Sequence, residues 1–373
     1  MVRKLGKNVL RKRRNTKIFF KGRYIKYPFE NGLSGLQRRD NIECLYSYVE
    51  NWMKFKKGKS KEPRNFREWM YRTFGEGITE KYLIPYNRKV WNFEPGKMAV
   101  DWVKDRVPQP PVEDVIKSSL GIQTEGYTHQ LYFYYPKNGG INSLIKAFEH
   151  KLKGRITLGF DVKRVGKEEN KWVVSDGKTE KKFDRIISTI PIEKFVDIYH
   201  GTPKEIKRAA KGLKHNSLVT VLLGFDVKKM NDLHWLYFPR EKEGLFNKVC
   251  FPFNNSSHVT PKGKSSAIVE ITCAPQESIW KMKDEKLIEH VVDKLDHHKV
   301  AKKETVCFSK VMRSKHAYVI NDLDYNKNTI ILRNFFADEG VVLCGRFSEF
   351  KYLGMDATVK SAMEKAEQLN RTF

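Results

Sequence analysis

A stretch near the C-terminus combines residue types that can bind the negative part of a ligand. Val341–Cys344 is a short apolar run typical of a buried strand, and Gly345 interrupts it. A loop of polar and aromatic residues follows, and Asp356 is placed to cap a helix. The apolar positions of this helix recur at Val359, Met363 and Ala366. A free helix N-terminus after a glycine turn attracts anions, because its first amides lack partners and the helix dipole is positive there. An ordinary strand-to-helix connection explains the pattern equally well.

A second candidate site combines aromatic and cationic side chains in Tyr82–Trp91 and continues into Val103–Pro108. Such side chains suit a nucleotide, because aromatic rings stack on its base and cations hydrogen-bond to its phosphates. The same spacing also suits a helix end packed on a core. Taken alone, the spacing favours this structural interpretation.

Other common chemistries have no support in the sequence. The five cysteines are scattered and form no C-x-x-C pair, which predicts reduced thiols and neither a disulfide framework nor a zinc site. Gly75-Glu-Gly77 lacks a third glycine and follows a predicted helix, so it is no dinucleotide fingerprint. The ten histidines include no H-E-x-x-H, and His297-His298 ends a charged helix, where surface exposure is expected. We therefore expect no metal.

The segment Gly345–Asp356, read as G-R-F-x-E-F-K-Y-L-G-M-D, resembles the closing FAD motif of the UDP-galactopyranose mutase family. That family belongs to the flavin amine oxidase and protoporphyrinogen oxidase superfamily. The resemblance implies FAD as the cofactor, with Arg346 and Tyr352 beside the flavin and the substrate diphosphate. Gly354 departs from the pattern, because the mutases have an acidic residue there. The cofactor residues implied in this segment are Gly345, Arg346, Met355 and Asp356.

Three further stretches carry the resemblance. Tyr132–Gly140 is similar to the superfamily's Y-P-x-x-G-G signature, in which Gly139 and Gly140 let a helix start close to the flavin. Val162 corresponds to the position whose backbone contacts the adenine. Arg185–Pro191 resembles the V-I-S-T-I-P strand that returns the chain from the flavin domain to the substrate domain.

The resemblance also implies a substrate site. Tyr86–Trp91 is similar to the mutases' Y-T-x-K-Q-W segment near the uridine, and Arg106-Val-Pro108 matches their R-x-P. The mutases have a further arginine after that proline, on a loop that grips the diphosphate. Gln109-Pro-Pro111 stands here instead, which argues against UDP-galactose as the substrate. The residues implied are Tyr86, Trp91, Arg106 and Tyr318 for substrate binding, and Arg346, Arg313 and Tyr352 for catalysis.

The elements that must position these residues predict an α/β protein, in which an incomplete Rossmann-like FAD-binding domain is interleaved with a substrate domain of helices and an antiparallel sheet. We assign residues 1–35, 126–195 and 321–373 to the FAD domain, and residues 36–125 and 196–320 to the substrate domain.

Individual elements follow from periodicity and turn residues. A hairpin turns at Lys21-Gly22, and a helix is predicted over Asp40–Met53 with Asp40 as its cap. Its apolar residues form a helical stripe at Ile42, Leu45, Val49 and Trp52 or Met53. Further predicted helices cover 65–74, 141–148 and 283–298, the last with Leu287, Val291, Val292 and Leu295 inward. The predicted strands cover 155–165 (a pair), 171–175, 185–191, 217–225, 233–238, 247–253, 266–272 and 305–311.

The composition of the chain limits the kinds of binding partner that we expect. The 71 Lys and Arg against 44 Asp and Glu give a net charge of +27, but the basic residues are dispersed. Dispersed lysines favour a solvated surface over a specific nucleic-acid footprint. No apolar run is long enough to span a membrane and no signal-like segment follows the basic N-terminus, so we expect a cytoplasmic protein. Peripheral association with a membrane surface stays open.

The family's opening G-x-G-x-x-G unit is not found in this sequence. We therefore expect a truncated or split protein that binds FAD weakly by itself, with a separate N-terminal FAD-binding polypeptide as one source of the unit. The leading hypothesis is a flavin enzyme resembling UDP-galactopyranose mutase. In such an enzyme covalent catalysis by flavin N5 changes the ring size of a nucleotide sugar for surface polysaccharide synthesis. The alternatives are a flavin oxidoreductase of the amine oxidase or protoporphyrinogen oxidase type, and an inactive homologue or basic binding module.

Overall fold

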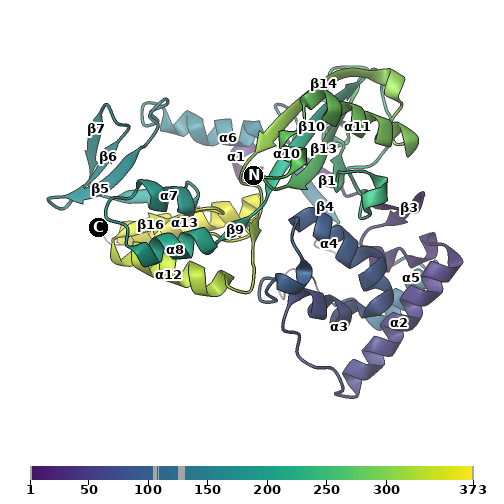
Figure 1. Ribbon diagram of the computed structural model, residues 1–373. Helices are drawn as coiled ribbons and strands as arrows, with labels where there is room; N and C mark the ends of the chain where they lie inside the picture. Colours follow the sequence, from purple (N-terminus) through teal and green to yellow (C-terminus); the bar gives the residue numbers. More distant parts are fainter. Residues whose placement is uncertain (1, 104–106, 108, 125–130, 372–373) are drawn as a thin grey trace. The chain divides into compact units, whose positions relative to one another are not determined.

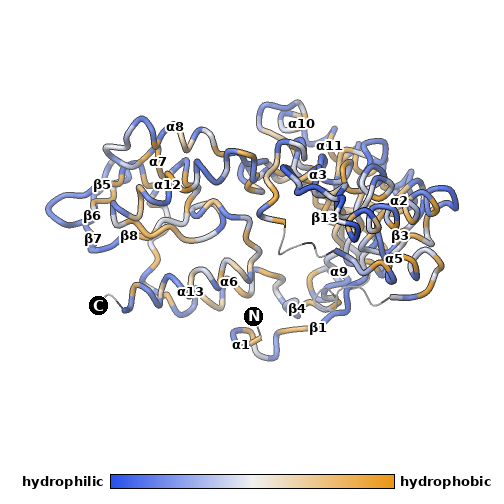
Figure 2. The backbone as a smooth tube through the Cα atoms, turned by 90° about the horizontal axis from the view of Figure 1, so that it is seen from below, coloured by the Kyte–Doolittle hydropathy of each residue, from blue (hydrophilic) through white to orange (hydrophobic). Residues whose placement is uncertain are grey.

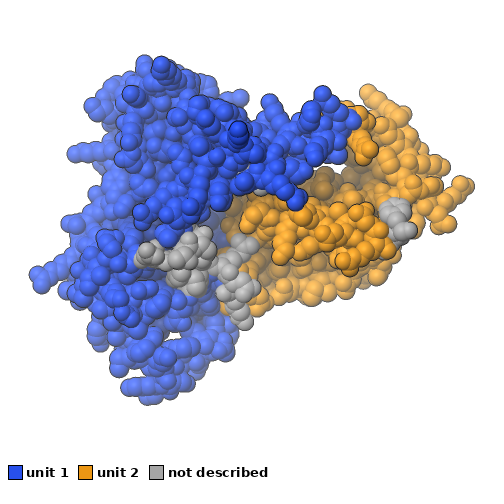
Figure 3. Space-filling view, turned by 180° about the vertical axis from the view of Figure 1, so that it is seen from behind, with its two compact units in different colours: residues 1–96, 103–153, 217–315 blue, residues 97–102, 154–216, 316–373 orange. Residues whose placement is uncertain are grey.

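The structure is a computed structural model that describes residues 2–103, 107, 109–124 and 131–371. The chain forms two compact units (Figure 3). Unit 1 contains residues 1–96, 103–153 and 217–315, and unit 2 contains residues 97–102, 154–216 and 316–373. Both units are built from segments that are far apart in the sequence. The mixed α/β class with interleaved segments is confirmed.

Unit 1 is organised around a seven-stranded sheet in the order β14-β10-β13-β12-β11-β2-β3. Figure 1 shows β14, β10 and β13 of this sheet side by side. The strands are β2 Thr16–Phe20, β3 Arg23–Lys26, β10 Ser217–Phe225, β11 Trp235–Tyr237, β12 Lys248–Cys250, β13 Ser265–Cys273 and β14 Val306–Ser314. Neighbours pair antiparallel except β11 and β2, which are parallel. Every second residue of β10 is buried, from Ser217 to Phe225, as the two-residue period of a strand requires. The expected antiparallel sheet is therefore present.

One face of this sheet packs on α11 (Asp284–His297), whose four predicted inward residues are all buried.

The hairpin of β2 and β3 turns at Lys21 and Gly22, both of which have positive φ. A separate antiparallel pair joins β1 (Val9–Arg13) to β4 (Tyr132–Pro136). The other α-helices of unit 1 are α1 Val2–Leu5, α2 Arg38–Lys56, α3 Phe66–Ile78, α4 Ile84–Trp91, α5 Val112–Ser119, α6 Asn142–Glu149, α9 Pro252–Asn255 and α10 Ser278–Lys281. A π-helical turn, Thr79–Leu83, joins α3 to α4, and α9 occupies the end of the stretch predicted as a strand over 247–253.

The predicted cap of α2 is wrong. The helix begins at Arg38, so Asp40 lies within its first turn rather than before it. The buried Asp40 carboxylate forms ion pairs with Lys21 Nζ at 2.8 Å and Lys81 Nζ at 3.1 Å. Since both lysines come from other parts of unit 1, tertiary contacts and not helix capping explain this aspartate.

The predicted apolar stripe of α2 is buried only in part, since Leu45 packs against the core of unit 1 whereas Ile42 does not. Cys44 and Tyr48 are buried, whereas Ile42 is 58% exposed. The α3 backbone passes so close to α2 that a Cβ on Gly75 would lie 2.5 Å from the Ser47 carbonyl oxygen. This close contact with α3 decides which side of α2 faces inward, and hydrophobic periodicity alone does not contain it.

Unit 2 holds three small sheets. β5 (Arg164–Glu168), β6 (Lys171–Ser175) and β7 (Glu180–Phe183) form an antiparallel meander, and β9 (Lys214–His215) pairs with β15 (Val319–Ile320). β8 (Ile186–Ser188) and β16 (Val341–Leu343) form a parallel pair. The strand pair predicted over 155–165 is wrong, because strand structure begins only at Arg164. The helices are α7 Ile192–Ile198, α8 Lys204–Gly212, α12 Tyr325–Asp338 and α13 Met355–Arg371.

Apolar residues of α7, α8 and α12 form the core of unit 2, together with side chains of β16. In contrast, α13 has no buried residue, although its sequence alternates between hydrophobic and hydrophilic stretches (Figure 2). Met355, Val359 and Met363 are 64%, 39% and 55% exposed, and Ile187 of β8 is 51% exposed. The apolar repeat predicted for this helix therefore marks an exposed apolar stripe.

Two further observations concern the cysteines and the helices. All five cysteines have free side chains in the structure. Within the described residues, no helix has both the length and the apolar character needed to cross a bilayer.

Candidate functional site

The connection from β16 to α13 forms the centre of the candidate site in unit 2. Gly345 follows β16 after a single residue, the buried Cys344, and has φ +92°, a left-handed conformation that glycine adopts without strain. Its N–H donates to Glu349 Oε2 at 2.9 Å. The expected strand, glycine turn and helix are thus present in that order.

Arg346 ties this connection to a neighbouring segment. Its guanidinium donates to the Leu353 carbonyl through Nε at 2.8 Å and also through Nη2, and Nη1 donates to the Ala317 carbonyl at 3.0 Å. A guanidinium is planar and presents several donors in fixed directions, so it can hold two backbone segments at once. Arg346 is therefore a fixed positive charge on the connection.

Two tyrosines flank this charge. The Arg346 guanidinium carbon lies 5.5 Å from the ring centre of Tyr318 and 5.2 Å from that of Tyr352. These distances are within the range of cation–π contacts. The two tyrosine rings meet edge to face at 5.9 Å, and Trp102 contacts Tyr352 in the same manner at 6.2 Å. Three of the predicted site residues, Arg346, Tyr318 and Tyr352, therefore lie together.

Glu349 is the buried acid of the same connection. It accepts hydrogen bonds from the Gly345 N–H, from Ser361 Oγ at 2.5 Å and from Lys351 Nζ at 3.1 Å. Burial raises the pKa of Glu349, but these hydrogen bonds outweigh burial and hold its pKa below the ordinary value. The carboxylate thus fixes the turn as an anion that is already paired.

The start of α13 is accessible. Met355 and Asp356 are both exposed, and a Cβ on Gly354 would lie 2.7 Å from Asp356 Oδ1. Asp356 lies in the first turn of the helix and is not its cap, since α13 begins at Met355. Val162 lies before β5 and packs against the core of unit 2.

The remaining predicted residues belong to unit 1, apart from Arg106, which lies outside the described residues together with Pro108. Gly139 and Gly140 form the turn between β4 and α6 with φ of +75° and +58°. This turn lies near an apolar pocket of about 650 Å³ that is lined by residues of β10, β13 and β14 and by the loop at residues 259–261. Tyr135 and Val259 line the pocket and are the nearest neighbours of a Cβ built on Gly140.

Arg313, on β14, already has partners within unit 1. Its Nη1 donates to Asp284 Oδ1 at 2.7 Å, and its other nitrogens donate to the carbonyls of Trp280 and Met282. The guanidinium therefore holds the segment between α10 and α11. A phosphate would have to compete with these three partners.

Tyr86 and Trp91 lie on α4. Tyr86 stacks on Tyr82 at 5.3 Å and meets Tyr237 edge to face at 5.4 Å. Trp91 is only 4% exposed, and its Nε1 donates to Asn87 Oδ1 at 3.0 Å. In this conformation Tyr86 extends an aromatic cluster, whereas the ring of Trp91 is almost inaccessible.

Sequence reasoning missed three contributors to the cluster in unit 2. Glu349 lies within Gly345–Asp356, the segment that resembles the closing FAD motif, so this motif could have indicated it. Trp102 and Ser361 carry no signal of their own, because only the fold brings them to Tyr352 and Glu349.

Comparison with known proteins places the fold. No protein-family model matches the sequence. The structure is similar to that of a reduced UDP-galactopyranose mutase, with a TM-score of 0.83 and 23% identity over 92% of this chain and 74% of the other. A protein of Exiguobacterium sp. 255-15, described as a protoporphyrinogen oxidase, gives a TM-score of 0.76 and 15% identity over 99% and 83%. A putrescine oxidase variant gives 0.67 and 12% over 100% and 84%. The fold is therefore shared with these enzymes.

Proposed function

We propose that this chain is an FAD-dependent enzyme that acts on a nucleotide sugar in the manner of a UDP-galactopyranose mutase. The observation that carries the proposal is the cluster of Arg346, Tyr318 and Tyr352 beside the turn at Gly345, within a fold similar to that of the mutase. The sequence motif that resembles the family's FAD motif is the segment that forms this turn.

The residues of unit 2 fit a flavin. Gly345 lacks a side chain where a ring would approach the backbone, and a Cβ there would find its nearest neighbour, Thr358 Cγ2, only at 3.8 Å. The N-terminus of α13 is exposed and suits an electron-rich group. Bound FAD would supply covalent or redox chemistry.

The chain's own residues would bind and orient the substrate. Arg346 is held by the Leu353 and Ala317 carbonyls, so its charge would meet a diphosphate without first being ordered. Tyr318 and Tyr352 would limit the orientation of the ligand above this charge. Negative charge on a leaving diphosphate would be stabilised by a cation that is already in position.

A second candidate is a flavin oxidoreductase on an apolar or amine substrate. Two observations favour it: Trp91 is almost fully buried, and Gln109-Pro-Pro111 replaces the arginine of the mutase loop. The similarity to the two oxidases agrees with this alternative. A pocket lined mainly by apolar residues in unit 1 would suit such a substrate.

Nucleotide binding separates the two candidates. A mutase-type site predicts that UDP and UDP-galactose raise the midpoint of thermal unfolding, since a ligand that binds only the folded state stabilises it. Uridine, which lacks phosphates, should raise it less. If saturating UDP leaves the midpoint unchanged, whereas apolar amines raise it, the oxidoreductase is the better assignment.

Flavin binding tests the cofactor. FAD is titrated against the purified chain, and against the chain co-expressed with the product of the reading frame immediately upstream, with riboflavin as control. Saturable binding that quenches FAD fluorescence in either preparation supports the proposal. Its absence from both would leave the inactive homologue as the remaining interpretation.

A further inference from the structure

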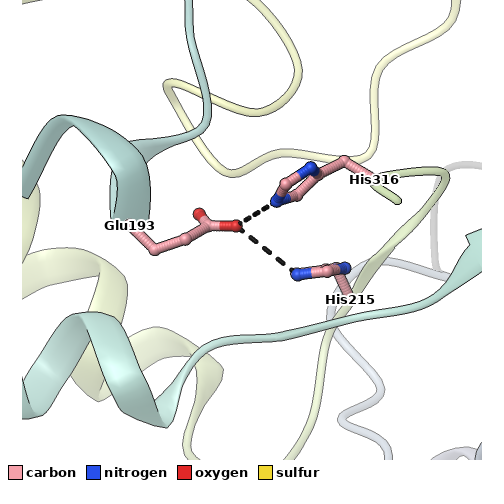
Figure 4. A group of neighbouring side chains, drawn as sticks. All are labelled: Glu193, His215 and His316. Carbon is pink, nitrogen blue, oxygen red and sulfur yellow. Dashed lines mark hydrogen bonds and ion pairs between the residues drawn. The ribbon is translucent and has the colours of Figure 1, made fainter. Parts of the chain in front are cut away.

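A group of three side chains in unit 2 takes no part in the proposed flavin site. Glu193 extends from the first turn of α7, His215 from β9, and His316 from the segment just before β15 (Figure 4). All three belong to the same compact unit although they are far apart in the sequence. The group is therefore a product of the fold.

The donor atoms of these side chains converge. Glu193 Oε1 lies 2.8 Å from His316 Nε2 and 3.5 Å from His215 Nε2. All candidate ligand atoms lie within 4.8 Å of one another, and the imidazole rings are 4.3 Å apart. For a tetrahedral metal with bonds of about 2.0–2.1 Å, neighbouring ligand atoms are about 3.3 Å apart. The observed separations lie on either side of that value.

Hydrogen bonding within the group leaves one acceptor unused. Both imidazoles point at the same oxygen, Oε1, while the buried Oε2 of Glu193 has no hydrogen-bond partner among the described residues. An unpaired buried carboxylate oxygen is costly, and a cation removes that cost. The group is thus incompletely satisfied as it stands.

The backbone holds the ligands in place. The N–H of Ile192, next to Glu193, donates to the Phe347 carbonyl at 3.1 Å. β9 pairs with β15, so that His215 lies opposite Val319. The Ala317 N–H donates to the Asn216 carbonyl at 2.9 Å and links the segments that follow the two histidines. Such support orients ligands before a metal arrives.

We propose that Glu193, His215 and His316 form a binding site for a divalent transition metal, for which Zn²⁺ is the probe. Imidazole nitrogen and carboxylate oxygen are ligands that Zn²⁺ accepts, and three protein ligands leave one position for water or a further ligand. The side chains are 17–21% exposed, so the site is sheltered but accessible. The bound metal would cross-link α7, β9 and the segment before β15, independently of any flavin.

The test uses the full chain, stripped of metal with a chelator that is then removed. Co²⁺ is titrated first, because a low-symmetry site with nitrogen and oxygen ligands absorbs visible light much more strongly than octahedral hydrated Co²⁺ does. Zn²⁺ should then displace one Co²⁺ per chain. At Zn²⁺ concentrations about 100-fold above the dissociation constant, the folding equilibrium constant should rise about 100-fold.

Three variants assign the site. Glu193→Gln and His316→Gln should each weaken Zn²⁺ binding at least about 10-fold, because each removes a ligand at nearly constant shape. His200→Gln is the matched control, since His200 is exposed in the same unit. Each variant is compared with its own metal-free form, so a loss of basal stability does not count as loss of binding.

The proposal is overturned if wild-type protein does not increase the visible absorption of Co²⁺ and shows no zinc-dependent stabilisation. It is also overturned if Glu193→Gln and His316→Gln bind as tightly as wild type, or if His200→Gln weakens binding as much as they do. Selective loss in the two ligand variants supports it. Neither cobalt absorption nor zinc-dependent stabilisation requires flavin or UDP to bind, so the outcome of this test is independent of the proposed enzymatic function.

Discussion

Glu30 is a buried acid whose ionisation should control the stability of unit 1. It is only 5% exposed and lies between buried Phe29 and Asn31 in a short 3₁₀ turn. Burial raises the pKa of Glu30 from its ordinary value of 4.5 to about 7, because the charged form loses its hydration. The folded protein therefore holds a proton that the unfolded chain releases at the same pH.

This difference fixes the sign of the pH dependence. Between about pH 4.5 and pH 7 the unfolded chain binds fewer protons at this site than the folded protein, so stability falls as the pH rises. The contribution is fully present below pH 4.5 and lost above pH 7. A pKa raised from 4.5 to about 7 corresponds to about 3 kcal/mol in the free energy of unfolding.

The substitution Glu30→Gln removes the ionisable group at nearly constant shape. Urea unfolding of wild type and variant is measured from about pH 4 to about pH 8, and the difference between their free energies of unfolding is followed. Because other groups titrate in both proteins, the difference isolates Glu30. The variant should gain about 3 kcal/mol relative to wild type as the pH rises across this range.

Glu76→Gln, at an exposed glutamate of the same unit, is the control for the exchange of glutamate for glutamine. If the Glu30→Gln difference does not change between about pH 4 and about pH 8, Glu30 titrates alike in the folded and unfolded states, and the reasoning from burial is refuted.

Three further substitutions test contacts described above by urea unfolding. Gly75→Ala should destabilise the protein by more than about 2 kcal/mol, because Gly75 has φ +71° and a Cβ would lie 2.5 Å from the Ser47 carbonyl oxygen. A loss of stability below about 0.5 kcal/mol would contradict this close contact. Asp40→Asn should cost about 3 kcal/mol near neutral pH, since it removes the carboxylate that two lysines contact. Burial raises the pKa of Asp40, but hydrogen bonds from those lysines outweigh burial and hold the pKa below its ordinary value. The loss of stability in Asp40→Asn should therefore shrink as the pH falls through this lowered pKa. A loss of stability that does not depend on pH would argue against the ion pairs. Arg346→Lys should cost about 2 kcal/mol, because an ammonium cannot reproduce the paired hydrogen bonds to Leu353, and unchanged stability would show that they contribute little.

Local patterns in the sequence predicted elements whose causes are local. The hairpin at Lys21 and Gly22 follows from residues that accept positive φ, and the inward face of α11 follows from a helical apolar repeat. The strand, glycine turn and helix around Gly345 were predicted for the same reason. The cluster of Arg346 with Tyr318 and Tyr352 was indicated by family resemblance and not by spacing.

Tertiary structure decided the features that depend on distant segments. Ile42 of α2 is exposed because α3 packs closely at Gly75 on another side of the helix. Trp91 is buried and Arg313 is paired because of neighbours that no local pattern specifies. Glu193, His215 and His316 meet only because β9 pairs with β15 and the adjoining backbones hydrogen-bond. Periodicity along the chain determines which side chains can share a face, whereas long-range packing determines which of them touch.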